Sequence, residues 1–85
     1  MQTFTFTIND ELGIHARPAG VLVKEAKNFE SEIIFIKGEA RADVRKIFSL
    51  MKLGAKKGES ICVEITGPDE EAASKAFQEL VQAQL

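Results

Sequence analysis

The sequence predicts one α+β domain, a two-layer open-faced sandwich in which three helices cover one face of a four-stranded antiparallel sheet. Two observations lead to this fold class. Stretches with apolar residues at every second position alternate with stretches of helical periodicity, in the order βαββαβα. The chain has 85 residues and shows no internal repeat, low-complexity tract or linker. One domain is therefore expected to span residues 1–85.

The first strand and the first helix are predicted from their side-chain periods. Thr3–Ile8 alternates threonines with apolar residues that we expect to face the core, namely Phe4, Phe6 and Ile8. Arg17–Lys27 has helical spacing, and Pro18 suits its first turn because proline lacks an N–H that would otherwise have no partner there. No Ser, Thr, Asn or Asp stands immediately before this helix to cap it. Its first amides are therefore expected to be open to phosphate oxygens or to water.

Two strands and a short helix are expected in the middle of the chain. Glu32–Ile36 is typical of a buried strand, and Ala40–Asp43 predicts a short, weak strand after a turn. Arg45–Leu53 predicts a short helix that stops at Gly54. The apolar stripe of this helix, which we expect to face the core, consists of Ile47, Leu50 and Met51. Phe48 lies off the stripe and is expected on the surface.

The last strand and helix follow the same logic. Ser60–Thr66 alternates, and its outward positions are expected to include the chain's only cysteine, Cys62. Gly67–Asp69 opens the last helix, in which Glu70 and Glu71 complement the positive end of the helix dipole. Its apolar face is formed by Ala73, Ala76, Phe77, Leu80 and Val81.

Composition and charge exclude several classes of protein. The formal net charge of −2 gives no support for nonspecific nucleic-acid binding. No apolar run has the length of a membrane span, and the N-terminus lacks a secretion signal pattern, so we expect a cytoplasmic protein with no membrane insertion. One cysteine excludes an internal disulfide, and one histidine with one cysteine makes no convincing metal site. Neither a metal nor another cofactor is expected.

The charges are distributed unevenly along the chain. Residues 15–52 carry eight basic and five acidic side chains, a local net charge of +3 in a chain whose total is −2. A basic surface in this part of the chain would suit phosphate or an acidic partner protein.

The only histidine lies in the octapeptide Gly-Ile-His-Ala-Arg-Pro-Ala-Gly, residues 13–20. An uncharged imidazole nitrogen is a nucleophile, and histidine is uncharged for much of the time at neutral pH. A helix start offers free N–H groups and a positive dipole end, and both favour an anion. Arg17 lies two residues after His15, and small neighbours such as Ala16 and Gly20 leave the amides accessible. This combination predicts a histidine that accepts a phosphoryl group and holds it briefly.

The octapeptide strongly resembles the active-site signature of HPr, the histidine-containing phosphocarrier of the bacterial sugar phosphotransferase system. The resemblance extends over the whole chain and includes Leu50–Gly54, Gly58 and the acidic start of the last helix. It implies a relay from phosphoenolpyruvate through enzyme I to Nδ1 of His15, then to the IIA domain of a sugar permease. It also implies that Arg17 assists the phosphohistidine, with the phosphate held near Ala16 and Arg17. Such a carrier is no enzyme with independent turnover, and we expect a monomer.

The resemblance also implies a docking surface for partner proteins. Ile47, Phe48 and Met51 are similar to the apolar docking patch of the family, although Ile47 and Met51 would each also fit a simple core role. Phe48 is the strongest candidate, because aromatic rings are enriched where proteins dock. The expected surface further includes Gly20, Lys24, Lys27 and Lys52, with Arg45 and Lys46 at its rim. Each of these charges would also fit a plain solvated role, and their expected effect is to steer an acidic partner.

One position departs from the family pattern. The family commonly has a serine where this chain has Lys46, and in many Gram-positive members a regulatory kinase phosphorylates that serine. A lysine cannot be phosphorylated in that way, and Ser49 lies nearby in the wrong register. The sequence therefore predicts no serine-kinase switch.

Other functions remain open at this point. An NPr-type carrier of the nitrogen branch would share these residues, and nothing in the sequence separates the two branches firmly. A regulatory module that kept the fold and binds a target protein is another class, although the presence of His15 with Arg17 argues against it. A small hydrolase is disfavoured because no carboxylate or serine is obviously paired with the histidine.

Overall fold

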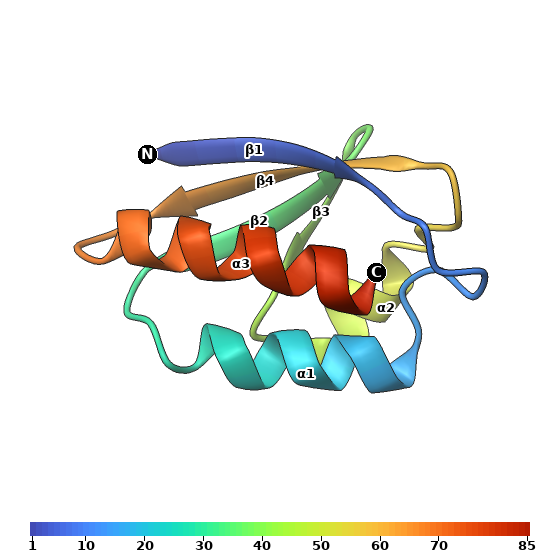
Figure 1. The fold of residues 1–85 in the computed structure, drawn as a ribbon, viewed down its shortest axis with the longest axis horizontal. Coiled ribbons are helices and arrows are strands. Elements are labelled where there is room, and N and C mark those ends of the chain that lie inside the picture. The colour runs from blue at the N-terminus through green and yellow to red at the C-terminus, as the bar shows by residue number, and fades with distance from the viewer.

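The computed structural model describes residues 1–85 and contains the predicted succession of strands and helices (Figure 1). The strands are β1 (Gln2–Thr7), β2 (Glu32–Lys37), β3 (Ala40–Asp43) and β4 (Ser60–Thr66), and the helices are α1 (Ala16–Ala26), α2 (Ile47–Lys52) and α3 (Glu70–Gln84). β3 and β4 have the predicted bounds, β2 is one residue longer than predicted, and β1 and α1 each begin and end one residue earlier than predicted. None of the three helices combines the length and the hydrophobicity needed to cross a lipid bilayer.

α2 is shorter than expected, which corrects the prediction of a helix over Arg45–Leu53. Asp43 closes a turn ahead of it. The side-chain carboxylate of Asp43 accepts the N–H of Arg45 (2.9 Å), and the main-chain carbonyl of Asp43 accepts the N–H of Lys46 (3.0 Å). Such bonds from a short polar side chain compete with helix formation. Lys46 is extended (φ −113°, ψ 101°), so the helix begins only at Ile47.

The four strands form one antiparallel sheet in the order β1-β4-β2-β3, which makes β1 and β3 the edge strands. All three helices lie on the same face of this sheet, as predicted (Figure 1). The central pair brings Phe35 of β2 opposite Val63 of β4, and both side chains are fully buried. Cys62 points to the opposite face of the sheet, where it is half-buried and forms no disulfide.

The core lies between the sheet and the helices. Its largest buried side chains include Phe35 of β2, Phe77 of α3 and Leu22 of α1. Phe4 and Phe6 were expected to face the core, and they do pack against it, but they are only half-buried. Their strand is at the edge of the sheet, and both rings line a hollow between β1 and α3. Edge strands leave part of their core-side residues exposed in this way.

Candidate functional site

The loop between β1 and α1 is attached by backbone hydrogen bonds to two other parts of the molecule. The N–H groups of Asn9 and Asp10 donate to the main-chain oxygen of Leu85, at 2.6 and 2.7 Å. The N–H of Ile14 donates to the carbonyl oxygen of Ala55, at 3.1 Å. These bonds fix both ends of the loop, and thereby the direction in which the chain enters α1.

Gly13 allows the close contact between this loop and the segment after α2. Its φ angle is +66°, in the left-handed region that favours glycine. A Cβ atom at this position would overlap the carbonyl oxygen of Ala55, the same oxygen that accepts the N–H of Ile14. Only glycine satisfies both demands, so Gly13 determines where the next residues, including His15, lie.

His15 is the N-cap residue of α1 and has an extended backbone (φ −120°, ψ −177°). No side chain caps this helix, as the sequence predicted. The first intrahelical bond runs from the N–H of Ala19 to the carbonyl oxygen of His15 (3.0 Å), and Pro18 has no N–H. The N–H groups of Ala16 and Arg17 are therefore free of intrahelical partners, and they lie directly after the histidine.

An aspartate faces the imidazole ring. Oδ2 of Asp10 lies 3.6 Å from Nε2 of His15, and each side chain is about one third exposed. Nδ1 of His15 makes no hydrogen bond within the protein. The view that no carboxylate is paired with the histidine is therefore wrong. Residue spacing did not reveal this contact, because it depends on a turn that brings Asp10 back toward the ring.

The residues expected beside the histidine come from α1 and α2, which pack against each other (Figure 1). Arg17 and Lys24 of α1 are exposed, as is Lys27 at its C-cap. Gly20 is half-buried, with open space where a Cβ would lie. Of the three hollows in the surface, none is lined by His15 or Arg17. The candidate site is therefore an open surface, in contrast to an enclosed pocket.

The residues of α2 divide between core and surface. Leu50 is fully buried, and Ile47 is half-buried and packs against the core. Phe48 is 79% exposed, as predicted, and Met51 is 38% exposed, which corrects its expected place in the core stripe. A helix of only six residues buries a narrow face, and Met51 lies outside that buried face. The exposed positions of α2 also include Lys52, with Lys46 just before the helix.

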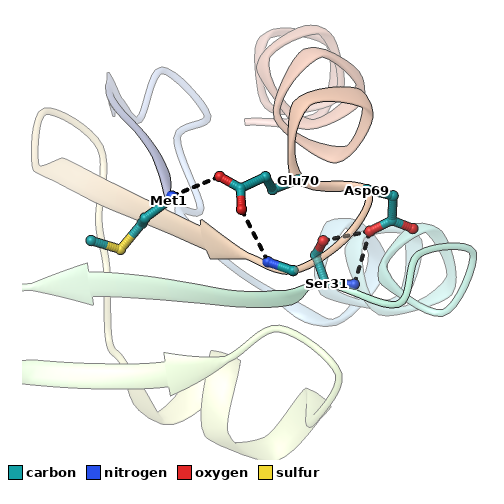
Figure 2. A network of polar contacts seen from close by, with 5 residues as sticks. Met1, Ser31, Asp69 and Glu70 are labelled. Atoms are coloured by element: carbon teal, nitrogen blue, oxygen red, sulfur yellow. Dashed lines mark hydrogen bonds and ion pairs between the residues drawn. The ribbon is translucent and has the colours of Figure 1, made fainter.

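A second polar cluster, which the sequence did not indicate, joins the start of α3 to the start of β2 (Figure 2). The carboxylate of Asp69 accepts the N–H groups of Glu30 and Ser31, both at 2.9 Å, and the hydroxyl of Ser31. These bonds, that of the Ser31 hydroxyl first, lower the pKa of Asp69. Glu70 accepts the N–H of Gly67 (3.3 Å) and pairs with the Met1 ammonium (2.7 Å), which is the main cause of its lowered pKa.

The geometry defines a class of protein. A ring nitrogen without an internal partner lies directly before free helix amides, and an exposed arginine follows two residues later. These features are typical of a domain that carries a phosphoryl group from one protein to another.

Comparisons with known proteins identify the family. The family model described as "PTS HPr component phosphorylation site" matches residues 2–83. The phosphocarrier protein HPr of Mycoplasma capricolum is 37% identical over 79 residues, which cover 93% of this chain and 89% of that protein. The HPr of Lysinibacillus sphaericus is 40% identical over 81 residues, covering 95% and 92%. The chain belongs to the HPr family of phosphocarrier proteins of the phosphotransferase system.

Solved structures agree with this assignment. HPr from Thermoanaerobacter tengcongensis superposes with a TM-score of 0.92 at 33% identity, covering 99% of this chain and 94% of that chain. The histidine-containing phosphocarrier protein of Mycoplasma superposes with a TM-score of 0.90 at 35% identity, covering 93% and 90%. The predicted fold class is confirmed.

Proposed function

We propose that this chain, as a single domain, receives a phosphoryl group on Nδ1 of His15 and passes it on. The donor is enzyme I, phosphorylated by phosphoenolpyruvate, and the acceptor is the IIA domain of a sugar permease. The observation that carries this proposal is the environment of the ring. Nδ1 has no partner within the protein, while Nε2 faces the carboxylate of Asp10 at 3.6 Å. The free nitrogen lies at an uncapped helix start, where an anion is favoured.

The transfer step needs positioning and charge stabilisation. The lone pair of Nδ1 attacks the phosphorus of the donor, and the arriving oxygens are stabilised by donors at the helix start. The N–H groups of Ala16 and Arg17 supply neutral hydrogen bonds, and the guanidinium of Arg17 supplies charge-assisted ones. Because the site is open, the next acceptor protein can approach the phosphoryl group directly.

The proposed docking surface joins an apolar patch to basic side chains. The patch consists of Ile47, Phe48 and Met51, and the exposed ring of Phe48 is its most prominent element. Around it, the surface is formed by Gly20, Lys24, Lys27 and Lys52. Gly20 leaves room for a partner, because nothing lies within 4 Å of where its Cβ would be. The lysines attract acidic partners and increase the rate of encounter.

The same proposal includes six further features. The chain has no turnover of its own, it acts in the cytoplasm, and it works as a monomer. Because Lys46 stands where related carriers commonly have a serine, it has no serine-kinase switch. Its partners are proteins only, and it uses neither a metal nor another cofactor.

Two related functions compete with this one. The first is that of an NPr-type carrier, which draws on the separate enzyme I of the nitrogen branch. The second is that of a regulatory binding module with the same fold. One structural neighbour, the catabolite repression containing protein Crh of Bacillus subtilis, has a TM-score of 0.79 at 28% identity. The combination of His15 with Arg17 at an uncapped helix start favours a carrier.

The decisive experiment is incubation with phosphoenolpyruvate and enzyme I, with the sugar-type and the nitrogen-type enzymes in parallel. We expect acid-labile phosphate on the wild-type chain and none on His15→Gln, with faster labelling by the sugar-type enzyme. Faster labelling by the nitrogen-type enzyme would assign the chain to that branch. Binding of enzyme I without labelling would contradict the carrier function and favour the regulatory module.

A further inference from the structure

We propose that Asp10 is a positioning residue for His15, which keeps the ring proton on Nε2 and so leaves Nδ1 as the nucleophile. This inference rests on the proposed function, because it concerns the same ring. Its starting point is the pair of atoms described above, Oδ2 of Asp10 and Nε2 of His15, 3.6 Å apart. The hydrogen-bond partners of a neutral imidazole determine which of its two nitrogens carries the proton. An acceptor such as a carboxylate favours the proton on the nitrogen that it faces.

The Asp10 carboxylate is held in place from several sides. Its Oδ1 accepts the N–H of Leu12 at 2.8 Å, which leaves Oδ2 to face the ring. The N–H of Asp10 donates to the main-chain oxygen of Leu85 (2.7 Å), and the carbonyl oxygen of Asp10 accepts the N–H of Gly13 (3.0 Å). The two carboxylate oxygens therefore have different tasks, one in the turn and one at the ring.

The neighbouring acidic residue has a different partner. Oε1 of Glu11 pairs with the Nζ of Lys57 at 2.7 Å, and the only ion pair of His15 is the one with Asp10. The loop thus contains two consecutive acidic residues, of which one faces the histidine and the other does not. Glu11 therefore supplies a control with the same change of charge.

Asp10 holds the proton on Nε2 at every stage of the transfer. As Nδ1 attacks, a new N–P bond forms, the bond between phosphorus and the donor breaks, and the donor keeps that electron pair. The ring then carries a positive charge with its proton still on Nε2, where the carboxylate stabilises it. When the group leaves, the N–P electron pair returns to Nδ1, and the ring is neutral with the same proton. The 3.6 Å contact of the unloaded protein shortens as the ring becomes charged.

A purely structural role for Asp10 makes a different prediction. If Asp10 only held the turn through Leu12, asparagine would serve equally well, because its Oδ1 also accepts that N–H. With Oδ1 used in the turn, however, the amide nitrogen of Asp10→Asn faces Nε2 and donates to it. A donor at that place favours the proton on Nδ1, which removes the nucleophile.

The test uses the full chain labelled with ¹⁵N. Long-range ¹H–¹⁵N NMR, at a pH where the ring is neutral, reports which nitrogen of His15 carries the proton. We expect the proton on Nε2 in the wild-type chain and in Glu11→Gln, and a shift of the population toward Nδ1 in Asp10→Asn. Single-turnover labelling by phosphorylated enzyme I is expected to slow about 10- to 100-fold in Asp10→Asn, and not in Glu11→Gln.

A proton on Nδ1 in the wild-type chain would overturn the inference, as would an Asp10→Asn variant that matches Glu11→Gln in both measurements. If Asp10→Asn does not fold, Asp10→Ser replaces it, because a serine hydroxyl can accept the N–H of Leu12 without reaching the ring. Lower occupancy of Nε2 together with slower labelling then supports the inference, and unchanged values overturn it. A wild-type chain that is not labelled at all would contradict the proposed function, while the NMR result would still decide the role of Asp10.

Discussion

At the scale of single residues, Gly13 and His15 illustrate how a backbone position controls a reactive side chain. Gly13 lies two positions before the histidine and has a left-handed backbone (φ +66°). It packs closely against the carbonyl group of Ala55. Because the loop passes so close to the segment after α2, the backbone that leads into the histidine cannot shift without breaking these contacts. The backbone of the proposed reactive residue is thus positioned by a residue that has no side chain.

Gly13→Ala is expected to destabilise the fold by about 2 kcal/mol or more, because the new methyl group overlaps a backbone oxygen and the backbone is strained. The free energy of unfolding in urea measures this effect. Gly20→Ala is the matched control, since it adds a methyl group into open space inside α1. It is expected to stabilise the chain by about 0.5–1 kcal/mol. Equal free energies for the two variants would contradict this account.

The sequence suggested His15 and Arg17 as site residues because their proposed roles depend on local features, a helix start and a short motif. It did not identify Asp10, five residues before the histidine. The contact depends on the turn that Asp10 itself forms with Leu12 and on the bonds of the loop to Leu85. Such a contact is a property of the folded loop, and no periodicity in the sequence encodes it.

At the scale of elements, α3 is joined to the rest of the fold through its first residues. Asp69 is the N-cap of α3, yet its side chain caps nothing in its own helix. Its carboxylate instead accepts the N–H and the hydroxyl of Ser31, at the entry to β2 (Figure 2). It also accepts the N–H of Glu30. The fully buried Ser31 therefore links a helix and a strand that are far apart in sequence.

The Asp69 cluster predicts a pH dependence of stability. The pKa of Asp69 is lowered from the ordinary value of 3.8. Its ionised carboxylate therefore stabilises the fold fully above about pH 4, and this stabilisation is lost as the pH falls through the lowered pKa. Ser31→Ala removes the main cause of the shift. We expect lower stability at neutral pH and a shallower loss of stability in acid, measured by urea unfolding from neutral pH to about pH 2.

The control for Ser31→Ala is Ser60→Ala, an exposed serine whose hydroxyl lies 3.4 Å from that of Thr7. This variant should keep the acid profile of the wild-type chain. Some loss of stability in acid should persist in every variant, because the pKa values of Glu59 and Glu70 are also lowered. For Glu59 the main cause is the N–H of Lys56. An acid profile of Ser31→Ala identical to that of the wild-type chain would contradict the role of Asp69.

The same scale explains which elements the sequence predicted well. β4 has strict alternation between turns, and its predicted bounds are those of the structure. For α2, the apolar spacing indicated a helix but not its start. That start depends on whether Asp43 bonds forward to Arg45 and Lys46, a local competition between turn and helix. Boundaries of this kind are decided by single hydrogen bonds.

At the scale of the whole molecule, charge and shape divide the chain into different regions. Residues 15–52 have a local net charge of +3 although the chain as a whole has −2. This segment contains α1 and α2, which pack together and carry the proposed docking surface. The excess of acidic charge lies in the remaining residues, which include α3. On the proposed function, an acidic partner is therefore expected to be attracted to one part of the molecule.

This asymmetry predicts a salt dependence of phosphoryl transfer. We expect kcat/KM for labelling by enzyme I to fall as ionic strength rises from about 0.02 M to about 0.5 M, because salt screens charges beyond the Debye length. Lys24→Glu combined with Lys27→Glu should lower kcat/KM at low salt and have little effect at high salt. Lys75→Glu, on the exposed side of α3, is the control and should have a much smaller effect. Equal losses for both sites would contradict a steering surface.

The order of strands in the sheet could not be predicted from the sequence at this scale. Local patterns indicated four antiparallel strands with helices on one side, and this is correct. The order β1-β4-β2-β3 depends on pairing between residues far apart, such as Phe4 with Val63 and Phe35 with Val63. That choice is made by the packing of the whole core, which no single stretch of sequence contains.

The helix that begins after His15 lacks a cap of its own. On the proposed function, the cargo completes it, since a bound phosphate would satisfy the amides that the polypeptide leaves free. Loading and local folding then become linked equilibria, and the occupied form is more rigid at this end than the empty form. A partner that meets the two forms would encounter surfaces of different stiffness, and could discriminate a full carrier from a spent one on that basis alone.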